Sequence, residues 1–294
     1  MADMSDQSSF VDADGITVTY RQWNAASPRG AVVVAHGASE HSGRYERFAK
    51  ALNSAGWTVL APDHRGHGRA APAAVIGPRA MDGVLDDLDE IVLMAQEVGG
   101  PVVLFGHSLG SIIALRYAEA RDGRLAALVL SGPIGVMPGA DAIAEQMRAV
   151  VDAGRGDEPM NALAAFNESF EPARTPYDWL SRDEAEVDKY IADPLCGDEL
   201  PLSHGWVLAT FGGAHEGSEN VARLSARLPV LIAAGTRDPV SNFTANTQEL
   251  ARRMTAHGMT VTERYYPEAR HEILNETNRD EVTADIVGWL ETLD

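Results

Sequence analysis

A serine between two glycines is the part of this chain with the clearest capacity for chemistry. The segment Gly106-His107-Ser108-Leu109-Gly110 follows the apolar run 101–105 and precedes apolar residues at helical spacing. A strand, the pattern G-x-S-x-G and a helix in succession form a sharp turn that projects the serine hydroxyl above a sheet. Because this context accompanies the motif, the sequence predicts Ser108 as a catalytic nucleophile.

A serine hydroxyl needs a base to remove its proton and an acid to orient that base. After a turn of this kind, the acid and then the histidine are expected in loops that follow later strands. Asp238 follows the apolar run 229–235, and His271 follows the strand-like run 259–266. The sequence therefore predicts Ser108, Asp238 and His271 as a catalytic triad.

Chain order separates His271 from the other histidines considered as the base. The rejected candidates precede the serine, lie within its motif, lie in a segment without strand patterns, or end a helix. They are His36, His64, His67, His107, His204, His215 and His257. For the acid, Glu263 and Glu268 are less convenient alternatives, because they lie on or just after the last strand.

A serine nucleophile also needs backbone N–H groups that stabilise the negative charge formed on the attacked carbonyl oxygen. One donor is expected from the residue after the serine, which is Leu109. The second is expected from the loop after the first buried strand, and Ala38 is the candidate there. His36 is predicted to fasten this loop by hydrogen bonding rather than to transfer protons.

The sequence gives no indication of a metal or a nucleotide cofactor. Asp63-His64-Arg65-Gly66-His67-Gly68 contains metal-ligand residue types, but too few for a closed tetrahedral site, so a structural loop is predicted. Neither a G-x-G-x-x-G fingerprint nor a Walker loop is present. The single cysteine, Cys196, stands far from any base motif and is predicted to be a buried or half-buried side chain.

The order of apolar patterns predicts an α/β fold. Two strands joined at Asp14-Gly15 come first, and buried strands then alternate with amphipathic helices, which is typical of a mostly parallel sheet with helices on both faces. The strand patterns stop in 133–226, where short helical patterns and bulky apolar residues predominate. We predict a core of residues 1–132 and 227–294, with 133–226 as a helical lid inserted into it.

Net charge, apolar runs and cysteine content indicate which partners and which compartment suit the protein. The chain of 294 residues is 45% hydrophobic and 23% charged, as in globular proteins, and its formal net charge of −19 argues against binding nucleic acid. No apolar run reaches the roughly 20 residues that cross a bilayer, and the first residues lack the pattern of a secretion signal. A single cysteine fits a reducing compartment. We predict a cytoplasmic protein without stable membrane insertion.

Five motifs together resemble the monoacylglycerol lipase and lysophospholipase branch of the α/β-hydrolase superfamily. The resemblance implies an eight-stranded, mostly parallel sheet with a helical lid, Ser108, Asp238 and His271 as the triad, and Ala38 and Leu109 as oxyanion donors. The motifs are His36-Gly37-Ala38-Ser39-Glu40-His41-Ser42-Gly43-Arg44-Tyr45, Asp63-His64-Arg65-Gly66-His67-Gly68, Gly106-His107-Ser108-Leu109-Gly110, Gly235-Thr236-Arg237-Asp238-Pro239-Val240 and Ala269-Arg270-His271-Glu272-Ile273-Leu274-Asn275-Glu276.

The resulting hypothesis is a serine ester hydrolase that cleaves a small acyl ester, such as a monoacylglycerol or lysophospholipid, through an acyl-enzyme on Ser108. One alternative keeps the fold and changes the substrate to an amide, a thioester or a perhydrolysis reaction. Another is a ligand receptor without catalysis, which an intact triad disfavours. Dehalogenase and epoxide hydrolase chemistry is disfavoured because it requires an aspartate at the position of Ser108.

Overall fold

The computed structural model describes residues 6–69, 79–121, 123–160, 163–197, 200–213 and 221–293, and these contain one eight-stranded sheet. The spatial order of the strands is β1-β2-β4-β3-β5-β6-β7-β8, and every neighbouring pair from β4 to β8 is parallel. β1 lies at one edge of the sheet and forms the predicted antiparallel hairpin with β2, which also pairs antiparallel with β4. The strands are β1 (Asp6–Val11), β2 (Thr17–Trp23), β3 (Gly30–Ala35), β4 (Trp57–Pro62), β5 (Val102–His107), β6 (Ala127–Ser131), β7 (Val230–Gly235) and β8 (Val261–Tyr266).

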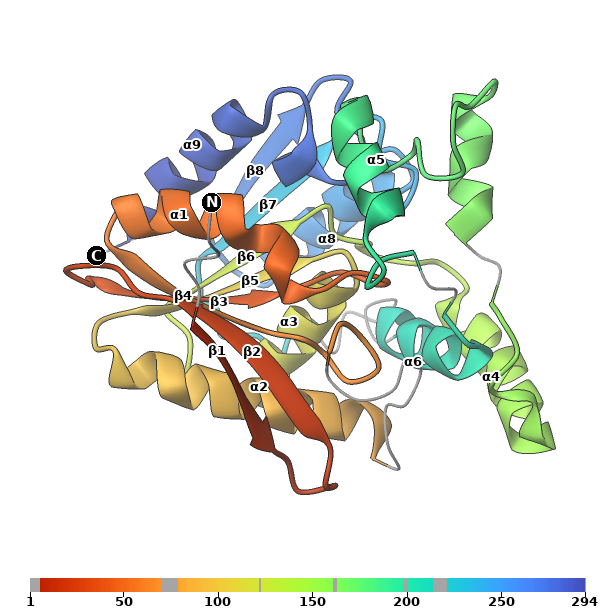
Figure 1. The fold of residues 1–294 in the computed structure, drawn as a ribbon, viewed down its shortest axis with the longest axis horizontal. Coiled ribbons are helices and arrows are strands. Elements are labelled where there is room, and N and C mark those ends of the chain that lie inside the picture. The colour runs from red at the N-terminus through yellow and green to blue at the C-terminus, as the bar shows by residue number, and fades with distance from the viewer. Residues whose placement is uncertain are drawn as a thin grey trace.

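Helices cover both faces of the sheet because its central strands are apolar on both sides. In β3, Val33 packs on the face covered by α2, α3 and α8, whereas Val32 and Val34 pack on the face covered by α1 and α9. The two layers are visible above and below the sheet (Figure 1). These helices are α1 (Glu46–Ser54), α2 (Ala80–Glu97), α3 (Leu109–Ala120), α8 (Ala245–Ala256) and α9 (Arg279–Leu290). The predicted α/β-hydrolase fold is confirmed for the described chain.

The start of α8 is set by its backbone conformation rather than by the apolar pattern alone. The sequence pattern predicts a helix from residue 243, but α8 begins at Ala245. Phe243 and Thr244 have φ values of 53° and 72°, which lie in the left-handed region and cannot continue a right-handed helix. The backbone turns there at the end of the loop that carries Asp238, where the N–H of Phe243 donates to the carbonyl of Asp238 at 2.8 Å.

Residues 133–226 lie between β6 and β7, and we call this segment the insertion. Its described part contains helices and turns, with an isolated bridge between Pro159 and Pro201 in place of strands. Figure 1 shows its helices gathered on one side of the core. They are α4 (Ala140–Val150), a π-helical turn (Val151–Arg155), a 3-10 helix (Leu163–Phe170), α5 (Glu184–Ala192) and α6 (Leu202–Gly213). Of the helices in the described ranges, none has the length and apolar character needed to span a bilayer.

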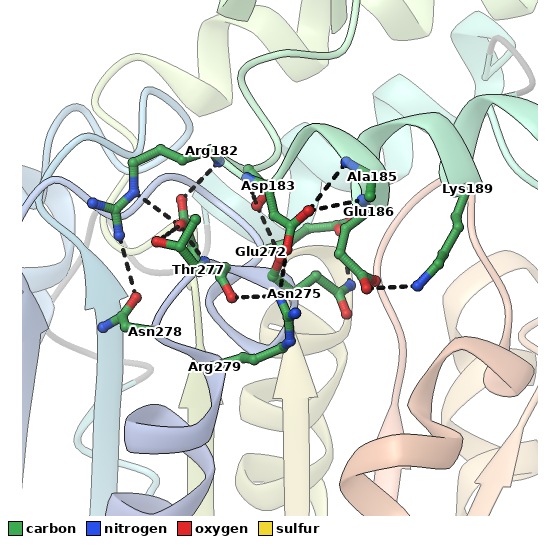
Figure 2. A network of polar contacts seen from close by, with 12 residues as sticks. Arg182, Asp183, Ala185, Glu186, Lys189, Glu272, Asn275, Thr277, Asn278 and Arg279 are labelled. Atoms are coloured by element: carbon green, nitrogen blue, oxygen red, sulfur yellow. Dashed lines mark hydrogen bonds and ion pairs between the residues drawn. The ribbon is translucent and has the colours of Figure 1, made fainter.

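Ion pairs join the insertion to the loop and helix that follow His271 (Figure 2). Nε of Arg182 lies 2.8 Å from a carboxylate oxygen of Glu276, whose side chain is fully buried. Asp183 caps the first turn of α5 and accepts a hydrogen bond from Arg279 at 2.6 Å. The beginning of α5 is therefore fixed beside the loop that carries His271.

A buried arginine fastens the N-terminal hairpin to α2. Arg65 is fully buried, and its guanidinium lies 2.5–2.7 Å from carboxylates of Asp12, Asp14 and Asp87. Its side chain passes over Gly83 of α2, where the methyl group of an alanine would overlap the guanidinium. Since a buried charge is costly without partners, this cluster is stable only while the arginine and its carboxylates are present together.

Replacing Arg65 by methionine should lower the free energy of unfolding by about 3–5 kcal/mol, because it leaves carboxylates without their shared counter-ion inside the protein. Urea titration of both proteins measures the difference. Arg252, an exposed arginine paired with Glu249, provides the control, and Arg252→Met should change the stability by less than about 1 kcal/mol. Equal effects of the two substitutions would contradict the buried role of Arg65.

Candidate active site

Ser108 stands at the turn between β5 and α3 in a strained conformation. Its φ of 51° and ψ of −116° lie outside the regions that residues other than glycine usually adopt. The strain is imposed by close packing: a side chain on Gly106 would overlap the carbonyl oxygen of Gly110, and a side chain on Gly110 would overlap that of Ala35. The two glycines of the motif therefore let α3 approach β3 and hold the serine at the carboxyl end of β5.

Asp238 and His271 form a buried pair next to this turn. Nδ1 of His271 lies 3.0 Å from each carboxylate oxygen of Asp238, and the carboxylate also accepts a hydrogen bond from the N–H of Val240 at 2.9 Å. Because an ionised carboxylate can only accept, Nδ1 carries the proton and Nε2 is left with its lone pair. His271 and Ser108 line the same cavity.

The surroundings of His271 fix its ring and its pKa. The rings of His107 and Trp179 lie 4.9 Å and 5.2 Å from it, centroid to centroid. Burial lowers the pKa of His271, but the charge and hydrogen bond of Asp238, with a smaller effect of Glu272, raise it above its ordinary value. The histidine is thus oriented by packing and made more basic by neighbouring carboxylates.

The two candidate oxyanion donors lie in the cavity beside Ser108. Leu109 is the first residue of α3, where N–H groups have no partner within the helix, and Ala38 belongs to the loop after β3. His36 fastens this loop as predicted: its Nε2 accepts the N–H of His64 at 2.9 Å, and its Nδ1 lies 2.7 Å from the carbonyl oxygen of Gly37. The loop after β3 is therefore held close to the serine.

A buried charge network connects this loop to the loop of His271. The Arg44 guanidinium lies 2.7 Å from Glu40 and makes a two-point contact with Glu272 at 2.6 Å and 2.7 Å. Glu40 also accepts the N–H of Gly37 at 2.6 Å and the Tyr45 hydroxyl at 2.8 Å. Burial raises the pKa of Glu40, but Arg44 and other nearby groups bring it down to about 2. Glu40 thus stays ionised at neutral pH.

Glu276 binds the main chain of Arg270, the residue before His271. Its buried carboxylate accepts main-chain N–H groups from Arg270 at 2.9 Å, Arg182 at 3.0 Å and Thr277 at 2.8 Å. Since these donors come from the insertion and from both sides of the turn after His271, the Glu276 side chain fixes the loop of His271 and the insertion together.

Four buried histidines connect the loop after β3 to α6 of the insertion. Ring centroids lie 4.3 Å apart for His36 and His64, 5.4 Å for His36 and His67, and 5.7 Å for His67 and His204. Burial and neighbouring histidines lower the pKa of His67 to about 3, and burial lowers that of His204 to about 4. Neither ring nitrogen of His204 has a hydrogen-bond partner among the described residues. These two histidines are therefore neutral at pH 7.

One group of metal-ligand residue types appears among the described residues, and it consists of His41, Asp193 and Cys196. Nδ1 of His41 accepts the N–H of Gly43, so the neutral ring has its proton on Nε2, which donates to Asp193 at 3.0 Å. A metal at Nε2 would have to displace that hydrogen bond, and burial raises the pKa of the Cys196 thiol. The contacts favour a structural clamp between the loop after β3 and the insertion.

The sequence-predicted residues converge in space. Ser108, His271, Ala38 and Leu109 line one cavity, and Asp238 lies behind His271. The alternative acids lie elsewhere: Glu263 accepts the Tyr265 hydroxyl on an exposed part of β8, and Glu268 is exposed. His257 caps the end of α8. His215 lies outside the described residues.

Several contacts of the site were missed by sequence reasoning. The spacing of Glu40 and Arg44, four residues apart in a quoted motif, was a usable signal for an ion pair. Trp179 and His204 gave no signal, because they lie in the insertion, where no periodic pattern fixes which side chains face the core.

The fold and a serine on a strand-to-helix turn beside a histidine–aspartate pair define an α/β-hydrolase. The chain belongs to the Hydrolase_4 family, described as serine aminopeptidase S33, whose model matches residues 26–278. A monoacylglycerol lipase of Mycolicibacterium smegmatis is 31% identical over 291 residues, covering 96% of this chain and 95% of that protein. Human monoglyceride lipase is 34% identical over 199 residues, covering 67% of this chain and 62% of that protein.

Solved structures agree with this assignment. A thermostable carboxyl esterase from Bacillus coagulans, solved in complex with glycerol, superposes with a TM-score of 0.92 at 28% identity and covers 98% of both chains. The monoacylglycerol lipase of Paleococcus ferrophilus superposes with a TM-score of 0.75 at 27% identity, covering 94% of this chain and 99% of that one. The protein is accordingly a serine ester hydrolase of the monoacylglycerol lipase-like branch, and the relatives do not favour the alternative chemistries.

The histidine contacts of α6 predict acid sensitivity. In the unfolded chain a histidine titrates near 6.5, but the pKa of His204 is about 4 in the folded protein, so the unfolded state binds more protons between these values. Stability should therefore fall as pH decreases from 6.5 towards 4.

His204→Phe removes the contribution of His204 to this dependence, so the stability of the variant relative to the wild type should be roughly 3 kcal/mol greater at pH 4 than at pH 7. Urea titrations of both proteins at the two pH values measure the change. A pH dependence unchanged by the substitution would show that His204 titrates normally. His257→Phe, at the exposed end of α8, is the matched control.

Proposed function

We propose that Ser108, His271 and Asp238 are the catalytic triad of this ester hydrolase. The observation that carries the proposal is the strained Ser108 in one cavity with a histidine whose Nδ1 is bound to a buried carboxylate. In this arrangement Nε2 of His271 accepts the serine proton, and Asp238 stabilises the resulting imidazolium. The N–H groups of Leu109 and Ala38 stabilise the negative charge on the carbonyl oxygen.

The reaction proceeds in two displacements. Ser108 Oγ attacks the ester carbonyl while its proton passes to His271, and a tetrahedral intermediate forms. Collapse of this intermediate breaks the bond to the alcohol, which takes the proton from His271 and leaves an acyl-serine. Water, activated by the same histidine, then releases the carboxylic acid and restores the serine.

The substrate that fits best is a monoacylglycerol. The part of the cavity formed by the insertion is lined by apolar side chains, among them Ile143, Met147 and Leu200, which suit an acyl chain. The names of the relatives support a monoacylglycerol, and the glycerol complex of the Bacillus coagulans esterase supports glycerol as the leaving alcohol. A lysophospholipid is the second candidate, supported by a Bacillus subtilis phospholipase that is 32% identical over 112 residues.

We further propose that the insertion acts as a lid that forms the acyl side of the cavity. Trp179 and Leu180 place insertion side chains next to His271, and the Arg182–Glu276 pair holds that part in place. The N–H of Glu272 donates to the carbonyl of Leu180 at 2.8 Å, which joins the same two segments through the main chain. A cytoplasmic location for this activity stays a prediction.

Ser108→Ala should lower kcat for p-nitrophenyl and monoacylglycerol esters by about 10⁴-fold or more, because the acyl-enzyme can no longer form. Covalent labelling by a fluorophosphonate should disappear at the same time. Ser54→Ala, at an exposed position of α1, is the control and should keep full activity and labelling. Activity that survives in Ser108→Ala would overturn the triad assignment.

The acidic limb of kcat/KM should report the pKa of His271, since the base must be neutral before it can accept the serine proton. That limb is expected above pH 6.5, because neighbouring carboxylates raise the pKa of His271. Glu272→Gln removes one of these charges, so the limb should move to lower pH. Glu249→Gln, at a half-buried position of α8, is the control. A limb that does not move in Glu272→Gln would contradict the electrostatic role.

A further inference from the structure

A glycine in the insertion leaves room for two methionines in the wall of the cavity. Gly205 is a buried residue of α6 and lines the cavity together with Met147 of α4 and Met160. A methyl group placed on Gly205 would overlap the sulfur of Met160 and lie 3.1 Å from the sulfur of Met147. The Met160 sulfur therefore occupies space that a side chain at residue 205 would take, and the Met147 sulfur lies at the border of the same space.

Main-chain hydrogen bonds fix this arrangement. The N–H of Met160 donates to the carbonyl of Leu200 at 2.9 Å, and the N–H of Leu202 donates to that of Glu158 at 2.8 Å. The N–H of Ser203 adds a third bond, to the carbonyl of residue 156, at 3.0 Å. The segment before Met160 thus runs beside the beginning of α6 in a defined register, and α4 packs along the same helix. Met160 faces Gly205 because of this register.

We propose that Met147 and Met160, resting on Gly205, form the wall that limits acyl-chain length, and that the substrate carries a medium-length acyl chain. The proposal rests on the function proposed above, because it concerns the acyl group bound at Ser108. The cavity measures about 230 Å³. This volume is below the roughly 300–1,000 Å³ of pockets that hold drug-sized ligands, and part of it takes the ester group beside Ser108, so the remaining space favours an acyl chain of medium length.

The flexibility of methionine predicts how sharply activity falls beyond the preferred acyl-chain length. Methionine is unbranched, rotates about three bonds and fills irregular space. The two methionine side chains can therefore change rotamer when a longer acyl chain enters the cavity. Because Gly205 has no side chain, the sulfur atoms of both methionines can pack against its backbone. We therefore expect activity to decline gradually beyond the optimum in the wild type.

The test measures kcat/KM for p-nitrophenyl esters from acetyl to palmitoyl. The wild type should be most active on octanoyl or decanoyl esters. Gly205→Ala pushes the methionines into the cavity, so its optimum should shift to shorter chains, with decanoyl activity falling about tenfold and acetyl activity retained. Met160→Ala and Met147→Ala enlarge the cavity and should shift the optimum to longer chains.

Gly288→Ala is the matched control. Gly288 lies exposed on α9 with no atom close to an added methyl group, so this variant should keep the wild-type profile. A uniform loss across all chain lengths in Gly205→Ala, or unchanged optima in both methionine variants, would overturn the proposal. If Gly205→Ala does not fold, the methionine variants decide the question by their shift to longer chains.

The same series separates this inference from the proposed function. Turnover of acetyl and butyryl esters that depends on Ser108, with one optimum shared by all the variants, would refute the methionine wall and leave the triad intact. Absence of turnover at every chain length, together with no fluorophosphonate labelling of the wild type, would refute the proposed function and this inference with it.

Discussion

The close approach of α3 to β3 is the constraint on which the rest of the site depends. Gly110 packs against the carbonyl of Ala35, and no residue with a side chain fits that distance. This contact sets the angle at which the chain leaves β5, and that angle places Ser108 in the left-handed region. The backbone strain, of order 1–3 kcal/mol, is held by the packing of a sheet whose central strands are completely buried.

A second constraint follows from placing ionised groups in this apolar setting. Asp238 and Glu40 are nearly inaccessible to solvent, and a buried carboxylate is stable only with donors and counter-charges around it. Arg44 supplies the counter-charge for Glu40 and Glu272, while main-chain N–H groups satisfy Asp238 and Glu276. Since these partners come from separate loops, satisfying the charges also positions the loops relative to one another. Buried carboxylates therefore both raise the pKa of His271 and, through their hydrogen-bond partners, fix the loop that carries it.

The sequence was informative where a local pattern has one structural solution. Alternating strands and amphipathic helices defined the sheet, and chain order was enough to place His271 and Asp238 next to each other. The apolar residues that recur at helical spacing in α2 are all buried: Val84, Leu85, Leu88, Ile91, Val92 and Ala95. The predicted start of α8, at residue 243, was wrong, because helical periodicity carries no information about the left-handed residues that precede the helix.

The insertion shows why the remainder could not be predicted. Its helices are short and are held by contacts between residues far apart in sequence, such as Arg182 with Glu276 and His204 with His67. Such contacts leave no periodic signal, because each depends on a partner that another element supplies.

The core and the insertion also differ in what they contribute to the cavity. The proposed reacting groups belong to core loops whose geometry the sheet imposes, whereas most of the apolar side chains that line the cavity belong to the insertion. Substitutions in the insertion can therefore alter the shape of the cavity without disturbing Ser108, His271 or Asp238. Gly205 illustrates the point, since a single methyl group there would change the cavity wall and leave the serine turn untouched.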